Sequence, residues 1–392
     1  MSNRDNSATL SPERGLLTPF DFQFHTRLVF GCGAIRHLGN LATELGFRRP
    51  MLVADRGLVA AGHVSRAEQC LAAAGLSVVR FHELDVNPDT AMVETGCALA
   101  RTERVDSVIG MGGGSSMDCA KGINLLLTNG GRLENYRGYG KATQPMLPMI
   151  GIPTTAGTGS EAQSYAVIAD ATTHMKMACG DPKIAFRLAI LDPELTLSQP
   201  THVTAASGFD AIAHAVETTV STRRTAMSDC FAHEAWRLLN KNYERVLDRP
   251  GDVAARTAMH LGAFYAGLAI ELSMLGAAHA CANPLTARYR ITHGVALAIL
   301  LPHVVRWNSA SSEPLYRKLL GDTDNEDAGE RLAARLCVLR NHAGLPDRLQ
   351  TEGVDSNDLP RLADDAAQQL TGTFNPRPLS VDTALEVYQC AF

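Results

Sequence analysis

Short apolar runs alternate with longer amphipathic stretches through the first half of the chain. The runs predicted to be buried strands are residues 51–54, 77–81, 105–109, 149–152, 165–168 and 188–191. Between them, Ala-rich windows such as 67–74 and 89–100 place apolar residues at the spacing of an amphipathic helix. Strands separated by helices are typical of βαβ units, so this half is predicted to fold around a parallel sheet.

The pattern changes at Asp192-Pro193. From Val203 onward the chain is rich in Ala, Leu, His and Arg and has few β-branched runs. The windows predicted to form a helical bundle are 205–220, 227–239, 253–272, 294–307, 330–342 and 358–370. We therefore expect a frayed tail over residues 1–20, an α/β domain over residues 21–195 and an all-α domain over residues 196–392.

The charge balance excludes two classes of partner. The 392 residues include 36 Lys and Arg against 41 Asp and Glu, a net charge of -5, so no broad basic field is present to hold nucleic acid or an anionic membrane. The longest apolar run, residues 294–301, is far shorter than the roughly 20 residues of a membrane span.

Nine scattered cysteines without a C-x-x-C pair favour buried free thiols in a cytoplasmic protein.

A glycine-rich turn follows the apolar run at 105–109. It reads Gly110-Met111-Gly112-Gly113-Gly114-Ser115 and leads into the start of a helix, where Ser115 and Asp118 have the spacing of a capping box. Glycines let a phosphate approach the backbone, and free N–H groups at a helix N-terminus bind anions, so the last four residues are candidates to bind a pyrophosphate. The turn matches neither G-x-G-x-x-G nor a P-loop, and a tight turn without a ligand is the alternative.

Two further features fit a dinucleotide. A second loop, Pro153-Thr154-Thr155-Ala156-Gly157-Thr158-Gly159-Ser160-Glu161, offers hydroxyls for phosphate and ribose, although it also fits a polar turn beside a helix N-cap. Asp55 ends the run at 51–54, where an acid can accept hydrogen bonds from ribose hydroxyls and repel a 2′-phosphate. Asp55 therefore favours NAD over NADP, although the adjacent Arg56 opposes that repulsion.

One aspartate and three histidines form a candidate metal site. Asp210 and His214 are four residues apart, so a helix places both on one face. His279 and His293 flank a segment that Pro284 is expected to break or bend. All three histidines lie among apolar neighbours, where a buried imidazole needs a hydrogen-bond partner or a metal. One carboxylate and three imidazoles would leave a divalent cation an open position for a substrate oxygen, whereas each histidine alone fits a satisfied core residue.

Taken together, these motifs resemble the iron-containing, group III alcohol dehydrogenase family. The resemblance extends from Phe30 to about Asn308 and rests on the glycine turn with Ala120-Lys121, on the loop from Pro153, and on the Asp-His-His-His set. It implies a Rossmann-like NAD-binding domain followed by a helical domain, as in the dehydroquinate synthase-like architecture, with Fe²⁺ or Zn²⁺ between them. The positions that match dinucleotide contacts in the family are Asp55, Asn87, Gly114, Ser115, Asp118, Thr154, Thr155, Thr158 and Lys176.

The resemblance also implies an activity. A family member would interconvert a small alcohol and its aldehyde or ketone, with the metal as Lewis acid on the substrate oxygen and hydride moving to or from nicotinamide C4. It would act on a small molecule as a homodimer or higher homo-oligomer. Asn283 departs from the family pattern, because many relatives carry a further histidine there, near the nicotinamide and the substrate. An amide cannot relay a proton at neutral pH, so Asn283 puts the proton path in question.

Three alternatives remain open from the sequence. A hydroxyacid-oxoacid transhydrogenase would hold its cofactor tightly and would not turn over free NADH. A metal- and NAD-dependent lyase resembling dehydroquinate synthase would use NAD only transiently and accumulate no NADH. A non-catalytic relative would retain the fold as a binding module, and only Asn283 points that way.

Overall fold

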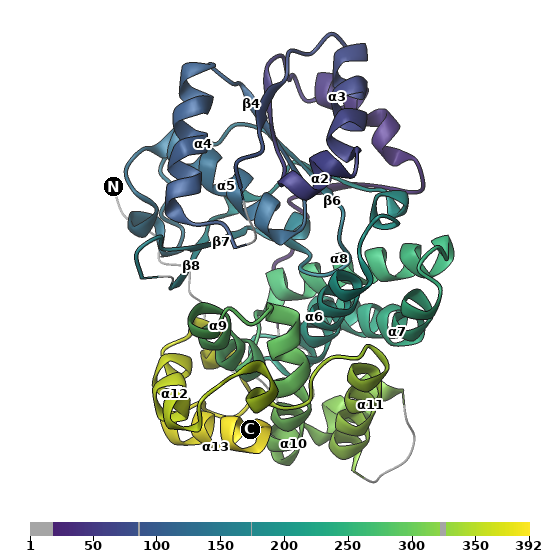
Figure 1. Ribbon diagram of the computed structural model, residues 1–392, viewed down its shortest axis with the longest axis vertical. Helices are drawn as coiled ribbons and strands as arrows, with labels where there is room; N and C mark the ends of the chain where they lie inside the picture. Colours follow the sequence, from purple (N-terminus) through teal and green to yellow (C-terminus); the bar gives the residue numbers. More distant parts are fainter. Residues whose placement is uncertain (1–18, 85–86, 174, 322–326) are drawn as a thin grey trace.

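A six-stranded parallel sheet forms the centre of the N-terminal part of the protein (Figure 1). The computed structural model describes residues 19–84, 87–173, 175–321 and 327–392. In spatial order the strands are β1 (Arg27–Phe30), β9 (Leu188–Leu191), β6 (Met149–Pro153), β4 (Ser107–Gly112), β2 (Pro50–Val53) and β3 (Val79–Phe81). Every neighbouring pair is parallel, as the alternation of runs and windows predicts.

Helices cover both faces of this sheet. They are α1 (Leu38–Glu44), α2 (Arg56–Ala60), α3 (His63–Ala73), α4 (Thr90–Thr102) and α5 (Gly114–Asn129). Successive residues of a strand point to opposite faces. Met51 and Val53 of β2 accordingly join a core with Ile123 of α5, whereas Leu52 joins a second core with Leu71 of α3. Burial on both faces explains why the strands are continuous apolar runs.

A second, three-stranded sheet lies beside α5. It contains β5 (Gly138–Tyr139), β8 (Lys176–Gly180) and β7 (Tyr165–Ala169), with β7 antiparallel to β8. The run at 165–168 is therefore a strand, but its expected place in the parallel sheet is wrong. Strands β7 and β8 are too close in sequence for the helical crossover that parallel strands require, so they pair as a hairpin.

The C-terminal part is helical and occupies the lower half of Figure 1. Its helices are α6 (Thr201–Val220), α7 (Ala226–Asp248), α8 (Val253–Ser273), α9 (Ala277–Tyr289), α10 (His293–Leu320), α11 (Ala328–His342), α12 (Leu359–Ala367) and α13 (Val381–Ala391). They share one apolar core that includes Phe209, Trp236 and Leu297. The predicted fold class is confirmed, whereas the domain boundary near residue 195 stays a prediction.

Two expectations need correction. Of the two effects expected of Pro284, a break or a bend, the break does not occur, because Pro284 lies inside the continuous α9. Tyr388 Oη donates a 2.6 Å hydrogen bond to the carbonyl of Cys281 in the preceding turn. All nine cysteines are free, but only four are buried: Cys32, Cys230 and Cys390 are exposed, and Cys70 and Cys337 are half-buried. Within the described residues no single helix has the length and hydropathy of a membrane span, and α8 and α9 reach that hydropathy only as a pair bent by 106°.

Candidate active site

Helix α6 places two of the predicted metal ligands on one face. Asp210 and His214 are separated by one helical turn, and both are buried among the alanines and Phe209 of this helix. Nε2 of His214 lies 3.2 Å from Oδ1 of Asp210. The i, i+4 spacing in the sequence therefore produces the expected contact.

Two further helices bring the remaining histidines to the same carboxylate. His279 is in the first turn of α9, and His293 is the first residue of α10. Their Nε2 atoms lie 3.6 Å and 4.0 Å from Asp210 Oδ1. The ring of His279 stacks on that of His214 with centroids 4.8 Å apart, and its centroid is 5.2 Å from that of His293. The structure thus brings together all four side chains that the sequence singled out.

Three of these side chains have the spacing of ligands for a divalent cation, and His214 contacts one of them, Asp210. Ligand atoms of Asp210, His279 and His293 all lie within 4.8 Å of one another. Asp210 Oδ1 and His279 Nε2 are buried and find no hydrogen-bond partner among the described residues, although such atoms are costly to leave unpaired. A cation bound to both atoms would satisfy them. Carboxylate and imidazole ligands suit Fe²⁺ and Zn²⁺ alike.

The electrostatics at Asp210 and His293 suit ligands that bind a metal without their protons. Burial alone would raise the pKa of Asp210, but His214, His279 and His293 hold it well below its usual value. Burial, assisted by the nearby charge of Lys176, lowers the pKa of His293 well below its usual value. The carboxylate is therefore ionised and the His293 ring neutral, and both can donate a lone pair to a metal.

A fifth buried group, which the sequence analysis missed, belongs to the same cluster. Glu217 lies three residues after His214 on α6, and one of its carboxylate oxygens contacts Nδ1 of His279. Burial disfavours a charged imidazole, but the carboxylates of Glu217 and Asp210 raise the pKa of His279 to about 9. Its helical spacing was the available signal, because Glu217 is seven residues after Asp210 and so lies on the same face of the helix.

The glycine turn joins β4 to α5 and has the geometry of an anion site. Gly112 has φ +145°, and a Cβ there would lie 2.3 Å from Ser116 Oγ, so only glycine fits. Helix α5 begins at Gly114, and its N-cap residue Gly113 provides no side-chain cap. The predicted capping box is wrong, because Ser115 Oγ instead accepts the N–H of Asn87 at 3.2 Å. Among the residues that the structure describes, no side chain therefore caps the first N–H groups of α5, which suits a phosphate.

The threonine loop lies against this turn. The N–H of Thr154 donates to the carbonyl of Gly112 at 3.0 Å. Cβ atoms built on Gly113 and Gly114 would lie 3.4 Å from Thr155 and 2.7 Å from Thr158. All three predicted threonines are therefore at or beside the start of α5.

Asp118 and Lys121 of α5 form hydrogen bonds that hold the threonine loop and the strand after it against this helix. Asp118 accepts hydrogen bonds from Ser160 Oγ at 2.7 Å and from the N–H of Val167 at 3.2 Å, so protein groups occupy both carboxylate oxygens. The fully buried ammonium of Lys121 donates to the carbonyls of Ser160 and Tyr165, each at 2.7 Å. The geometry suits Asp118 to positioning the loop better than to direct contact with a cofactor.

Asp55 lies at the carboxyl end of β2, next to the glycine turn. Its Oδ1 accepts the N–H of Leu58 at 3.1 Å and caps α2, while Oδ2 lies 3.4 Å from Ser116 Oγ. Because β2 and β4 are neighbours in the sheet, Asp55 and the turn share one edge. This is where the sequence predicted a ribose contact.

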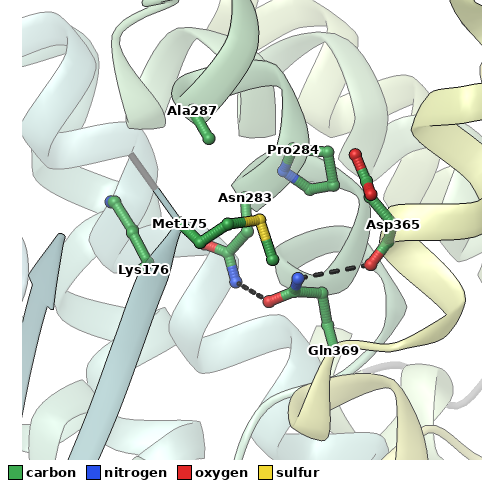
Figure 2. A pocket seen from close by; sticks show the side chains of 7 residues that line it. All are labelled: Met175, Lys176, Asn283, Pro284, Ala287, Asp365 and Gln369. Carbon is green, nitrogen blue, oxygen red and sulfur yellow. Dashed lines mark hydrogen bonds between the residues drawn. The ribbon is translucent and has the colours of Figure 1, made fainter. Parts of the chain in front are cut away.

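A small pocket lies between β8 and the helical part (Figure 2). Lys176, Asn283 and Gln369 line it, and Asn283 Nδ2 donates to Gln369 Oε1 at 3.2 Å. Gln369 Nε2 in turn donates to the carbonyl of Asp365 at 3.2 Å. Asn283 is one turn beyond His279 on α9, so the pocket adjoins the metal cluster. Its lining combines these polar side chains with the apolar Met175, Pro284 and Ala287. Burial lowers the pKa of Lys176 against the opposing charges of Asp210 and Asp118.

Comparisons with known proteins identify the family. A model described as iron-containing alcohol dehydrogenase matches residues 25–193, and one for the C-terminal part of the Fe-containing alcohol dehydrogenase family matches residues 204–392. Alcohol dehydrogenase 4 of Schizosaccharomyces pombe is 34% identical over 93% of this chain and 87% of its own length. The NAD-dependent methanol dehydrogenase of Bacillus methanolicus is 32% identical over 93% and 97%.

Solved structures agree with these matches. A crystal structure of 1,3-propanediol oxidoreductase is 33% identical and superposes with a TM-score of 0.92 over 96% of this chain and 100% of that one. The predicted family and fold are thereby confirmed, as is the general activity of an NAD- and metal-dependent alcohol/aldehyde oxidoreductase. This chain belongs to the iron-containing alcohol dehydrogenase family.

Proposed function

We propose that the protein oxidises a small primary alcohol or diol, or reduces the matching aldehyde, with NAD(H) and a divalent metal held by Asp210, His214, His279 and His293. The observation that supports this best is the convergence of one carboxylate and three imidazoles on a buried point reached from α6, α9 and α10. Relatives named for methanol and 1,3-propanediol support a small substrate. Iron is the favoured metal because the family model is described by it.

Residues of this chain define where the metal, the cofactor and the substrate would bind. When bound, the metal supplies Lewis-acid polarisation of the substrate oxygen, and NAD supplies the hydride acceptor. Asp210 provides the one formal negative charge among the four ligands. The N–H groups at the start of α5 would hold the pyrophosphate, and the adjacent Thr154, Thr155 and Thr158 would offer it hydrogen bonds. Lys176, on β8, lies at the pocket between these two halves of the site.

Proton transfer needs a route that does not pass through a histidine at position 283. The amide of Asn283 has no basic lone pair at neutral pH and is held by Gln369. It can orient a substrate hydroxyl or a water molecule but cannot accept the proton. We therefore propose that the proton leaves through water molecules. Asn283 lines the pocket and forms hydrogen bonds but does not take up the proton.

Accumulation of NADH tests the activity. Protein purified without oxygen would be loaded with Fe²⁺ or Zn²⁺ in parallel and assayed with NAD⁺ against methanol, longer primary alcohols, and 1,2- and 1,3-diols. We expect metal-dependent NADH formation with at least one of them. Tight NAD binding without accumulation of NADH on any alcohol would contradict the dehydrogenase and favour the transhydrogenase or the lyase.

Replacing Asp55 with serine is expected to weaken the preference for NAD. The carboxylate would repel a 2′-phosphate, whereas a serine hydroxyl can still cap α2. We expect the ratio of kcat/KM for NADP⁺ to that for NAD⁺ to rise about tenfold or more, the effect of roughly 1.4 kcal/mol. Asp252→Ser is the matched control, because it replaces another N-cap aspartate, on α8, far from the turn. An unchanged ratio in Asp55→Ser would refute this role.

A further inference from the structure

Glu217 is a buried carboxylate, and its two hydrogen-bond contacts within the described residues are both with the first turn of α9. Its side chain is on the face of α6 that bears Asp210 and His214, and the residue is only 2% exposed. One oxygen accepts the N–H of Ala278 at 2.6 Å, and the other contacts Nδ1 of His279. A buried carboxylate needs such partners, and the free N–H groups of a helix N-terminus favour its negative charge.

The two ring nitrogens of His279 have different surroundings. Nδ1 faces Glu217, whereas Nε2 is buried without a hydrogen-bond partner and lies 3.6 Å from Asp210 Oδ1. An ionised carboxylate can only accept a hydrogen bond, so the contact requires the proton to be on Nδ1. A metal binds the neutral form of the ring and displaces the proton from Nε2, and in that form the lone pair is on Nε2, the nitrogen directed at the proposed metal position.

We propose that Glu217 is a positioning residue of the metal site, which holds His279 in the tautomer and orientation that present Nε2 to the cation. The inference rests on the metal site of the proposed function and adds a residue to it. Within the described part of the chain, neither of the other two rings has a carboxylate partner at Nδ1. Nδ1 of His214 has no hydrogen-bond partner, and Nδ1 of His293 lies 3.4 Å from the hydroxyl of Thr286.

A second side chain anchors the same turn without touching a ligand. Asn375 Oδ1 accepts the N–H of Ala277 at 3.2 Å, next to the N–H that Glu217 accepts. Asn375 also exchanges hydrogen bonds with Asn308, at 2.9 Å and 3.0 Å. Loss of Asn375 would loosen the start of α9 but leave the contact between Glu217 and His279 in place. The Asn375→Ala variant is therefore a matched control for the part of Glu217's role that stabilises the start of α9, its hydrogen bond with the N–H of Ala278.

The test is the affinity of the metal-stripped protein for Co²⁺, measured by competition with a chelator, in wild type, Glu217→Gln and Asn375→Ala. Glutamine keeps the size of Glu217 and an oxygen for Ala278, but its amide N–H groups face Nδ1 and favour the tautomer protonated on Nε2. We expect Glu217→Gln to bind Co²⁺ about 10- to 100-fold more weakly and to alter its visible d–d bands. Asn375→Ala should lower the melting temperature but keep both the affinity and the spectrum.

Wild-type affinity and spectrum in Glu217→Gln would overturn the inference. A measurement on the wild-type protein gives an answer even if that variant does not fold. In the zinc-loaded protein with ¹⁵N-labelled histidine, we expect NMR to show a slowly exchanging proton on Nδ1 of His279 and a metal-bound Nε2. The opposite pattern would overturn the inference as well. Failure of wild type to bind any metal would instead contradict the proposed function itself.

Discussion

Replacing His279 with alanine is expected to remove the metal and reduce kcat/KM at least about a thousandfold. His279 faces the carboxylate of Asp210, and its ring packs against those of His214 and His293. Lewis-acid assistance contributes several kcal/mol to such reactions, and about 1.4 kcal/mol corresponds to a tenfold change in rate. Metal content after purification and NADH formation on the best alcohol measure the two effects separately.

His202→Ala is the control for this variant. His202 is on the same helix as Asp210 and His214 but is exposed, so its loss should change neither metal content nor activity. The His279→Ala variant should still bind NADH, because the glycine turn lies on a different part of the fold. A His279→Ala protein with wild-type metal content and turnover would remove His279 from the site.

Replacing Gly114 with valine is expected to weaken NADH binding at least about a hundredfold, roughly 3 kcal/mol. Gly114 is the first residue of α5, and a Cβ there would lie 2.7 Å from Cγ2 and 3.0 Å from Oγ1 of Thr158. A branched side chain would displace Thr158 and fill the space through which a phosphate approaches the helix N-terminus. Fluorescence titration with NADH measures the loss.

Gly251→Val provides the comparison for the glycine variant. Gly251 is exposed in the turn between α7 and α8, has no positive φ, and a Cβ there would meet no atom within 4 Å. We expect this variant to bind NADH normally, and both variants to retain the metal. Normal NADH binding by Gly114→Val would exclude the glycine turn as the pyrophosphate site.

The sequence predicted which segments form strands and helices better than it predicted which strands pair with one another. Apolar runs identified β2, β4, β6 and β9 because strands buried on both faces must be apolar throughout. The same local signal could not show that β7 pairs outside the main sheet. Pro284 illustrates the opposite case, since its local tendency to break a helix is overridden by the packing of α9 between α10 and α12.

The candidate site was predictable to the extent that its residues are close in the sequence. Asp210 and His214 follow from one helical turn, whereas their contact with His279 and His293 depends on the packing of α6, α9 and α10. Glu217 was missed because its partner is 62 residues away, so no local pattern connects the two.

Asp118 shows the same limit for the cofactor loops. The sequence placed it near the start of α5, but the hydrogen bonds from Ser160 and Val167 that engage its carboxylate come from tertiary packing. The motif therefore predicted where Asp118 lies in the fold. Only the structure shows that its carboxylate supports the threonine loop, a role that the motif could not distinguish from contact with a ligand.

The location of the bound metal tests the central claim most directly. Crystals of the iron- or zinc-loaded protein, measured at the absorption edge of that metal, would give an anomalous difference map. We expect one peak per chain, about 2.0–2.2 Å from a carboxylate oxygen of Asp210 and from a ring nitrogen of each of His214, His279 and His293. A peak at another position, or one that these four residues do not surround, would contradict the account.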